Sequence, residues 1–253
     1  MKTKAAVLYE AGQPVIIEEI TLDEPRQGEV LVRMKAAGVC HSDLHVRDGS
    51  IPEPLPLVPG HEGTGVVTEV GPGVSGLHAG DHVVLTLVPS CGNCYFCHRG
   101  EPHMCLTSAS MAARGVLRDG TSRLSVGTRM LHHFNSVSCF SEYVVVPQEG
   151  AVKIPHDMPV ETAALLGCAV ITGVGAVERT AGVRPEESVA VIGCGGVGLN
   201  VIQAASRSGA YPIIAIDIRP DKIEAARAKG IIHQIDSNSW ERHNEVSLPQ
   251  KVG

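Results

Sequence analysis

The strongest constraint on the fold of this chain is a glycine-rich turn near residue 195. The run GCGGVG, residues 193–198, follows the apolar run SVAVI and opens a helical pattern, GVGLNVIQAASRSG. An acidic residue, Asp217, ends the next apolar run about 20 residues further on. A G-x-G-x-x-G turn in this setting predicts a strand–turn–helix unit of a parallel, doubly wound sheet that binds a dinucleotide.

Each residue of the turn has a predicted role in cofactor binding. Gly193 makes the tight turn, and Gly195 lets the backbone approach the pyrophosphate. Gly198 lets the helix pack close to the sheet. Gly196 and Val197 lie at the start of that helix, whose free N–H groups face the phosphates.

Asp217 predicts which dinucleotide is bound. Its carboxylate can accept hydrogen bonds from the adenosine ribose hydroxyls and would repel a 2′-phosphate, which favours NAD over NADP. Arg219 lies close by in the sequence and softens this preference. The alternative interpretation is a glycine-rich turn of an α/β protein that binds nothing.

The pattern along the chain predicts two domains. Residues 1–155 contain short runs rich in β-branched residues, such as EVLVRMKAAGV and SEYVVVP, separated by Gly and Pro turns. They are expected to form an all-β, barrel-like domain, in which the stretch from Thr107 to Ser138 is a long surface excursion. Residues 156–253 alternate helical and strand patterns, and the expected strands are Val189–Ile192, Ile213–Asp217 and Ile231–Asp236.

Four cysteines in the segment 91–105 form a compact cluster. Cys91, Cys94, Cys97 and Cys105 give the spacing C-x2-C-x2-C-x7-C. Four thiolates from one loop can close a tetrahedron around a zinc ion and leave no position for substrate, so this lobe is expected to be structural. An iron–sulfur cluster is the rival, but the ferredoxin run has a shorter last gap. Disulfides are disfavoured because the chain is expected in the cytosol.

Charge and hydropathy limit the partners of the chain. The formal net charge is −6, which disfavours nucleic acid and anionic membranes as partners. The N-terminal run MKTKAAVLYE lacks the pattern of a signal peptide, and no apolar run reaches membrane-spanning length. We therefore expect a cytoplasmic protein with neither a nucleic-acid nor a membrane partner.

Three further elements, GVCHSDLH, PGHEGTG and LLGCA, contain Cys40, His61 and Cys168. No local spacing links these three residues. Taken singly, each is better explained as a buried thiol or a core histidine than as a metal ligand.

Together, however, these motifs resemble those of a known enzyme family. The run Gly60-His61-Glu62 with Gly65, Gly71 and Val74, the four-cysteine lobe and the GCGGVG turn follow one another in the family's order. Over residues 1 to about 236 the chain is similar to the zinc-dependent alcohol dehydrogenases of the medium-chain dehydrogenase/reductase family. Within this family, the long insert and the run SEYVVVP resemble the class that includes thiol-dependent formaldehyde dehydrogenases.

The resemblance implies an α/β fold. It consists of an N-terminal GroES-like β-barrel domain with a structural zinc lobe, followed by the first half of a Rossmann doubly wound parallel sheet. It also implies two zinc ions per chain, of which the catalytic one is bound by Cys40, His61 and Cys168. Glu62 is expected to lie beside that metal and to enter its coordination shell transiently. Asp43 is expected to orient the ring of His61.

The resemblance further implies an NAD-dependent oxidoreductase that moves a hydride between an alcohol, or an aldehyde adduct, and NAD. Thr172 is expected near the nicotinamide, His41 near the pyrophosphate and Lys222 near the adenosine ribose. The alcohol proton is expected to leave through Ser42, the cofactor ribose and His45. The identity of the alcohol or aldehyde stays open.

The sequence departs from the family's pattern after the third expected strand. The tail SNSWERHNEVSLPQKVG continues with none of the further strand–helix units of a complete fold, and the return to the first domain is also missing. Because the usual dimer forms through the sixth strand, the oligomeric state stays open. A truncated, non-catalytic zinc-binding isoform is the alternative function. A zinc-free quinone reductase is disfavoured because it would not need both cysteine sets.

Overall fold

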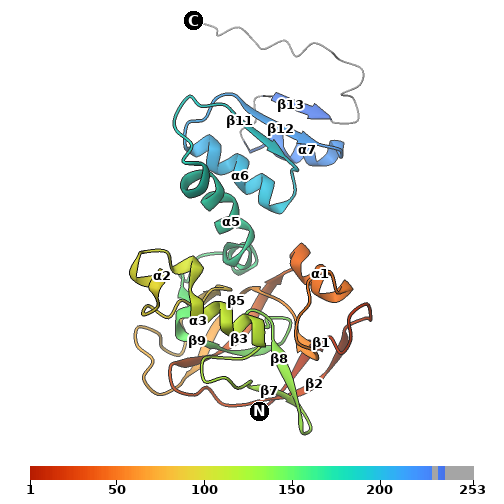
Figure 1. Cartoon of the computed structure of the whole chain (residues 1–253), viewed down its shortest axis with the longest axis vertical. Helices are drawn as coiled ribbons and strands as arrows, with labels where there is room; N and C mark the ends of the chain where they lie inside the picture. The colour runs from red at the N-terminus through yellow and green to blue at the C-terminus, as the bar shows by residue number, and fades with distance from the viewer. Residues whose placement is uncertain (230–232, 237–253) are drawn as a thin grey trace, which may run out of the picture. The chain divides into compact units, whose positions relative to one another are not determined.

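The computed structural model describes residues 1–229 and 233–236 of the 253-residue chain, the last four by their backbone. It divides into two compact units, the first spanning Met1–Cys168 and the second beginning at Ala169 (Figure 1). Each unit has buried apolar clusters of its own. The domain boundary predicted after residue 155 stays a proposal.

The first unit is built on two five-stranded sheets, with the orders β1-β2-β7-β8-β4 and β10-β6-β5-β3-β9. In β3 the buried Val30 and Val32 belong to one apolar cluster and Leu31 to another, so this strand joins two parts of the core. The strands are β1 (Lys2–Val7), β2 (Ile16–Leu22), β3 (Glu29–Gly38), β4 (Leu57–Val58), β5 (Glu62–Val70), β6 (His82–Leu85), β7 (Leu124–Val126), β8 (Arg129–His133), β9 (Tyr143–Pro147) and β10 (Ala151–Lys153).

Short helices connect these strands and carry much of the polar chemistry of the unit. The chain leaves β3 into α1, leaves β6 toward α2 and α3, and ends this unit with α4 and η3. The helices are α1 (His41–Asp48), α2 (Tyr95–His98), η1 (Pro102–Met104), α3 (Leu106–Arg114), η2 (Gln148–Gly150), α4 (Val160–Ala163) and η3 (Ala164–Gly167).

The expectation that Thr107–Ser138 is a surface excursion is wrong. This stretch contains most of α3 together with β7 and β8, and Leu117, Leu124 and Leu131 are almost fully buried. β7 pairs with β2, and β8 pairs with β4, both far away in the sequence. Strands of three and five residues are too short to display an alternating pattern, so their burial depends on partners that local sequence does not reveal.

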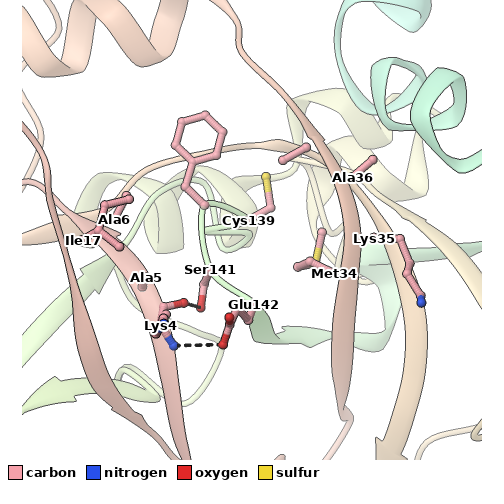
Figure 2. Close-up of a pocket in the computed structure, with 12 residues that line it drawn as sticks. Lys4, Ala5, Ala6, Ile17, Met34, Lys35, Ala36, Cys139, Ser141 and Glu142 are labelled. Atoms are coloured by element: carbon pink, nitrogen blue, oxygen red, sulfur yellow. Dashed lines mark hydrogen bonds between the residues drawn. The ribbon is translucent and has the colours of Figure 1, made fainter.

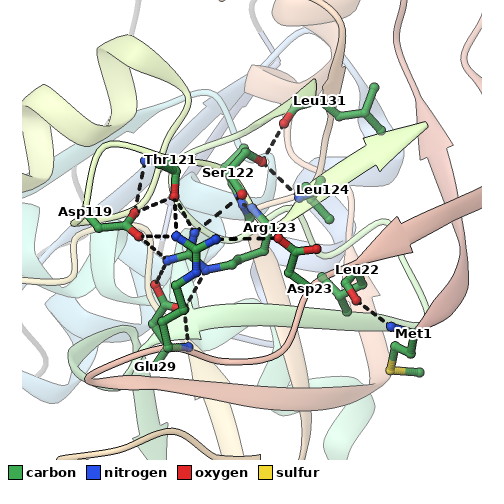
Figure 3. A network of polar contacts seen from close by, with 12 residues as sticks. Met1, Leu22, Asp23, Glu29, Asp119, Thr121, Ser122, Arg123, Leu124 and Leu131 are labelled. Atoms are coloured by element: carbon green, nitrogen blue, oxygen red, sulfur yellow. Dashed lines mark hydrogen bonds and ion pairs between the residues drawn. The ribbon is translucent and has the colours of Figure 1, made fainter. Parts of the chain in front are cut away.

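The same stretch places a charged side chain in the core (Figure 3). The Arg123 guanidinium is fully buried and donates to both carboxylate oxygens of Glu29, at 2.9 and 2.6 Å. It also donates to Asp119 at 2.7 Å and to the Thr121 hydroxyl at 2.6 Å. In the sequence, a charged residue at this position indicates a loop. In the structure, the Arg123–Glu29 ion pair connects the residue before β7 to the start of β3.

The second unit has the parallel sheet that the sequence predicts, in the order β11-β12-β13. α6 and α7 pack against β12 and against each other (Figure 1). The expected strand at Ile231–Asp236 is described from His233 onward, and residues 230–232 and the tail from Ser237 lie outside the described residues. The elements are α5 (Ala169–Gly175), η4 (Ala176–Ala181), β11 (Val189–Ile192), α6 (Gly196–Arg207), β12 (Ile213–Asp217), α7 (Pro220–Arg227) and β13 (His233–Asp236).

Among the described residues, β11 is hydrogen-bonded to β12 alone. Val191 and Ala215 point into the apolar cluster under α6, whereas the Ile192 side chain is 83% exposed. The fold class predicted from the sequence, a barrel-like β domain followed by a parallel α/β half-sheet, is confirmed.

Candidate functional site

The structure brings together four side chains that the sequence keeps far apart. Cys40 immediately precedes α1, and Cys168 follows η3. Glu62 is the first residue of β5, and His61 immediately precedes it. Their donor atoms all lie within 4.8 Å of one another. His61 and Glu62 are buried, and the two cysteines are partly exposed. We call these four residues the mixed donor set.

Asp43 holds two segments of the mixed donor set in place. One carboxylate oxygen accepts the backbone N–H of Cys40 at 2.9 Å. The other lies 3.1 Å from Nδ1 of His61 and accepts the backbone N–H of Gly60, also at 3.1 Å. With Nδ1 facing this carboxylate, Nε2 is the ring nitrogen left for a metal.

Neighbouring groups shift the pKa values of His61 and Cys40 in the mixed donor set. Burial opposes the imidazolium form, but the Asp43 carboxylate and the Cys168 sulfur raise the pKa of His61 to about 10. Burial likewise opposes the Cys40 thiolate, while hydrogen bonds from Ser42 and the nearby His61 ring lower the pKa of that thiol. Both shifts favour the ionised form of the group concerned, and a bound cation would take the place of a proton in this set.

The donor chemistry of the set fits zinc. Zinc takes thiolate sulfur at about 2.3 Å and imidazole nitrogen at about 2.0 Å, so donors around one tetrahedral ion are less than about 4 Å apart. Atoms clustered within 4.8 Å meet this requirement after small side-chain movements. Two sulfurs and one nitrogen leave a fourth position, which is the arrangement of a catalytic rather than a structural site.

The four cysteines of the segment 91–105 form the second donor set, also within 4.8 Å. The Sγ atoms of Cys94 and Cys97 are 3.5 Å apart at α2, and Cys105 accepts the backbone N–H of Cys91 at 3.3 Å. Hydrogen bonds from Thr107 and from the backbone lower the pKa of Cys91 to about 6, whereas burial and the Cys94 sulfur raise that of Cys97 to about 11. These thiols therefore titrate as an interacting group, and a bound cation would displace their protons.

The polar residues of α1 lie beside the mixed donor set. The Ser42 hydroxyl is 3.8 Å from the Cys40 sulfur. One turn further along, the His45 ring is half-exposed, 4.7 Å between centroids from the exposed ring of His41. Nδ1 of His45 is 3.7 Å from the Asp48 carboxylate.

The glycine-rich turn of the second unit has the predicted backbone geometry. Gly193 has a φ of +93° and its N–H donates to the Ile216 carbonyl at 2.8 Å, so the turn is closed against β12. A Cβ on Gly198 would meet the Gly193 carbonyl, which keeps α6 close to the turn. Gly195 is the N-cap residue of α6, and Gly196 and Val197 follow it as the first helical residues.

Asp217 lies at the end of β12 beside this turn. Its carboxylate accepts the backbone N–H of Cys194 at 2.7 Å and that of Arg219 at 2.9 Å, and these bonds lower the pKa of Asp217. A Cβ built on Gly195 would lie 3.7 Å from the Lys222 ammonium, so a cation faces the turn. Thr172 is exposed on α5 of the same unit.

A separate hollow of about 390 Å³ lies in the first unit between β1, β3 and the segment 139–142 (Figure 2). Its walls include Met34, Cys139 and Phe140, with Lys4 and Glu142 at the rim. The Cys139 thiol donates to the backbone carbonyl of Glu62 at 3.3 Å, and burial raises the pKa of this thiol. No residue of the mixed donor set lines this hollow, and Cys139 links its wall to the Glu62 backbone.

Two residues near the site had no signal in the sequence. The Phe134 ring contacts the His61 ring edge-on, with 5.3 Å between centroids, and the Cys139 thiol donates to the backbone carbonyl of Glu62. Phe134 lies in the stretch that was wrongly expected at the surface, and Cys139 belongs to neither of the two donor sets. Only the spatial arrangement connects them with the metal ligands.

The fold and site together define a class: a dinucleotide-binding oxidoreductase with one closed and one open zinc site. Comparisons with known proteins agree. Residues 26–156 match the alcohol dehydrogenase GroES-like domain, and residues 189–240 match the TrkA-N domain. The chain belongs to the zinc-dependent alcohol dehydrogenases of the medium-chain dehydrogenase/reductase family, as the sequence motifs predict.

Relatives and solved structures support this membership over nearly the whole chain. An S-(hydroxymethyl)glutathione dehydrogenase of Synechocystis is 47% identical, matching 100% of this chain and 69% of its own length. The Escherichia coli enzyme of that name is 43% identical over 96% and 66%, respectively. The chain therefore spans about two thirds of the length of these relatives.

Crystal structures of related proteins also match this chain. An alcohol dehydrogenase zinc-binding domain protein from Burkholderia ambifaria has a TM-score of 0.89 and 42% identity, covering 94% of this chain and 65% of the other. Benzyl alcohol dehydrogenase from Acinetobacter calcoaceticus has a TM-score of 0.88 and 37% identity with the same coverage. The predicted class of activity and the predicted cofactors, zinc and NAD, are confirmed at the level of the family.

None of the described helices is by itself long and apolar enough to cross a membrane, although one bent pair, Val160–Gly167 with Ala169–Ala181, passes on length and composition.

Proposed function

We propose that this chain transfers a hydride between an alcohol and NAD, with a catalytic zinc held by Cys40, His61 and Cys168. The observation that carries the proposal is the convergence of two thiols, one imidazole and one carboxylate from three separate segments. Such a set with an open position suits substrate chemistry, whereas the four-cysteine set suits structure.

When bound, zinc supplies a Lewis acid for a hydroxyl group and NAD supplies the hydride acceptor. The residues of the chain set up this chemistry. Asp43 fixes the tautomer and orientation of His61 through the 3.1 Å contact. Glu62 is proposed as an exchangeable oxygen donor of the same set. Cys91, Cys94, Cys97 and Cys105 are proposed to hold the structural zinc.

Ser42 and His45 are proposed to carry the alcohol proton toward solvent. The Ser42 hydroxyl beside the Cys40 sulfur is placed to accept a proton near the metal ligands. The half-exposed His45 ring one helical turn further is placed to pass it to solvent. The relay through the cofactor ribose stays part of this proposal.

The cofactor is proposed to bind on the glycine-rich turn of the second unit. Gly193, Gly195 and Gly198 shape the backbone for the pyrophosphate, and the N–H groups of Gly196 and Val197 face it at the start of α6. Asp217 is proposed to bind the ribose and Lys222 to lie beside it. His41 and Thr172 are proposed to contact the pyrophosphate and the nicotinamide, respectively.

The names of the relatives suggest the substrate class. Two relatives are S-(hydroxymethyl)glutathione dehydrogenases, and one structural neighbour is a benzyl alcohol dehydrogenase. We therefore propose a primary alcohol or a hydroxymethyl thiol adduct as substrate. A cytoplasmic location, and the lack of nucleic-acid and membrane partners, stay predictions of the same proposal.

Zinc content tests the two metal sites directly. The purified chain is expected to contain two zinc ions, measured by mass spectrometry of the metal. Cys40→Ser is expected to contain one, because it removes a donor from the mixed set. The matched control is Cys139→Ser, which lies outside both sets and keeps a hydroxyl donor toward Glu62; it should contain two. One zinc in the unchanged chain would contradict the catalytic site.

Turnover tests the activity of this chain. NADH formation should follow addition of benzyl alcohol or S-(hydroxymethyl)glutathione, and Ser42→Ala should slow it by roughly tenfold or more by removing a relay group. A chain that holds two zinc ions but oxidises none of these alcohols would support the alternative, a non-catalytic zinc-binding protein, and would leave the family assignment intact.

A further inference from the structure

Gly38, at the end of β3, faces Glu62 across the sheet. The two residues are register partners in the antiparallel ladder between β3 and β5. Partners in such a ladder project their side chains from the same face, with Cβ atoms about 5 Å apart. The Glu62 side chain therefore lies over the position where any other residue at 38 would carry its own side chain.

The space above Gly38 is filled by the Glu62 carboxylate. A Cβ built on Gly38 would collide with Oε2 of Glu62 and would lie 3.1 Å from its Cβ and 2.9 Å from a methyl group of Leu165. Gly38 is not among the residues with positive φ, so its backbone would accept any L-residue. It is the neighbouring carboxylate, and not the backbone, that requires glycine here.

The crowded neighbours differ in their freedom to move. The Leu165 side chain is 40% exposed and can rotate into solvent. Glu62 is only 2% exposed, its backbone pairs with Gly38, and its carbonyl accepts the Cys139 thiol. A methyl group at residue 38 would therefore displace the carboxylate of Glu62 from the mixed donor set, while the strand stays in register.

We propose that Gly38 is a positioning residue of the metal centre: its missing side chain lets the Glu62 carboxylate lie within reach of the metal. This inference rests on the proposed function, because it assumes that the mixed donor set holds zinc. Gly38 touches no ligand itself and acts through Glu62 alone. Gly38 differs in this from Asp43. Asp43 orients a ligand by a hydrogen bond, whereas Gly38 leaves space for the Glu62 side chain.

The test is metal affinity in the full chain, measured by competition with a chromogenic chelator. Gly38→Ala is expected to weaken the mixed donor set about tenfold or more, as loss of an outer support does, and to leave the four-cysteine set unchanged. With cobalt in place of zinc, the difference spectrum between Gly38→Ala and the unchanged chain should report the altered coordination.

A double variant separates positioning from a general structural effect. Glu62→Ala removes the carboxylate that the new methyl group would displace and leaves only the Glu62 Cβ and the movable Leu165 side chain nearby. Adding Gly38→Ala to it should therefore change the metal affinity by less than about twofold. If Gly38→Ala alone fails to fold, the double variant should fold, because alanine is tolerated in a strand better than glycine. The matched control is Gly175→Ala, whose Cβ would meet nothing within 4 Å; it should behave as the unchanged chain.

Four results would overturn the inference. Unchanged affinity and cobalt spectrum in Gly38→Ala would do so while leaving the proposed function standing. A tenfold loss that persists in the Glu62→Ala background, or a double variant that still fails to fold, would show that residue 38 acts through something else. An unchanged chain without metal in the mixed set would remove the proposed function and this inference together.

Discussion

At the scale of single residues, His133 makes the stability of the first unit depend on pH. The ring is 1% exposed, and its Nε2 accepts the backbone N–H of Arg123 at 3.3 Å. Burial, and then the charges of Arg123 and His132, lower the pKa of His133 to about 3. The folded chain thus keeps this imidazole neutral over a range in which an unfolded chain would protonate it, since a free histidine has a pKa of about 6.5.

The sign of the effect follows from proton binding. Between pH of about 3 and about 6.5 the unfolded state binds more protons, so the free energy of unfolding rises with pH, by up to about 1.4 kcal/mol per unit from this residue. Above that range the contribution is complete. His133→Gln should flatten the difference between urea unfolding at about pH 5 and about pH 7. An exposed histidine provides the control: His156→Gln should keep the slope, and equal slopes in both variants would contradict the prediction.

How well single site residues could be predicted depended on the kind of signal. The glycine turn and Asp217 could be predicted because strand, turn, helix and acid are neighbours in the sequence. Cys40, His61 and Cys168 were connected only through a family resemblance, since their spacing carries no local rule. Gly38 could not be predicted, because its importance depends on a cross-strand partner that only the register reveals.

At the scale of elements, the buried ion pair between Arg123 and Glu29 joins β7 to β3. Arg123→Met should lower the free energy of unfolding by about 3–5 kcal/mol, because it leaves the Glu29 carboxylate, 4% exposed, buried without its cation. Urea titration near neutral pH measures this. Arg26→Met is the matched control, since the Arg26 side chain is 51% exposed and pairs with Asp119 at 2.9 Å; it should cost less than about 1 kcal/mol. Equal costs would contradict the structural role of the buried pair.

The same region shows why element prediction failed where it did. β3 and β5 have 10 and 9 residues and their patterns were legible, but β7 has 3 and is buried through its pairing with β2. Arg123 also favoured the wrong prediction of a surface segment, because charged residues are almost never fully buried unless they are paired. The pairing partner, Glu29, is remote in sequence, so no local window contains both halves of the ion pair.

At the scale of the whole molecule, the two units have separate cores and separate proposed ligands. The metal donor sets lie within residues 40–168 of the first unit, and the glycine turn lies in the second. Apolar clusters around Val30 and around Ala5 belong to the first unit, and the cluster around Ile202 belongs to the second. A ligand that binds only the native form of one unit should stabilise that unit.

Calorimetry of the full chain should therefore resolve two unfolding transitions with different ligand responses. NAD at about 100 times its dissociation constant should stabilise the second unit by about 2.7 kcal/mol and raise its transition temperature by roughly 10–20 °C. Removing metal with a chelator should lower only the other transition. NADP at the same concentration should shift the NAD-responsive transition less, because Asp217 would repel its 2′-phosphate. If NAD and metal removal both moved one common transition, the units would unfold as one cooperative body, and stability could not be assigned to them separately.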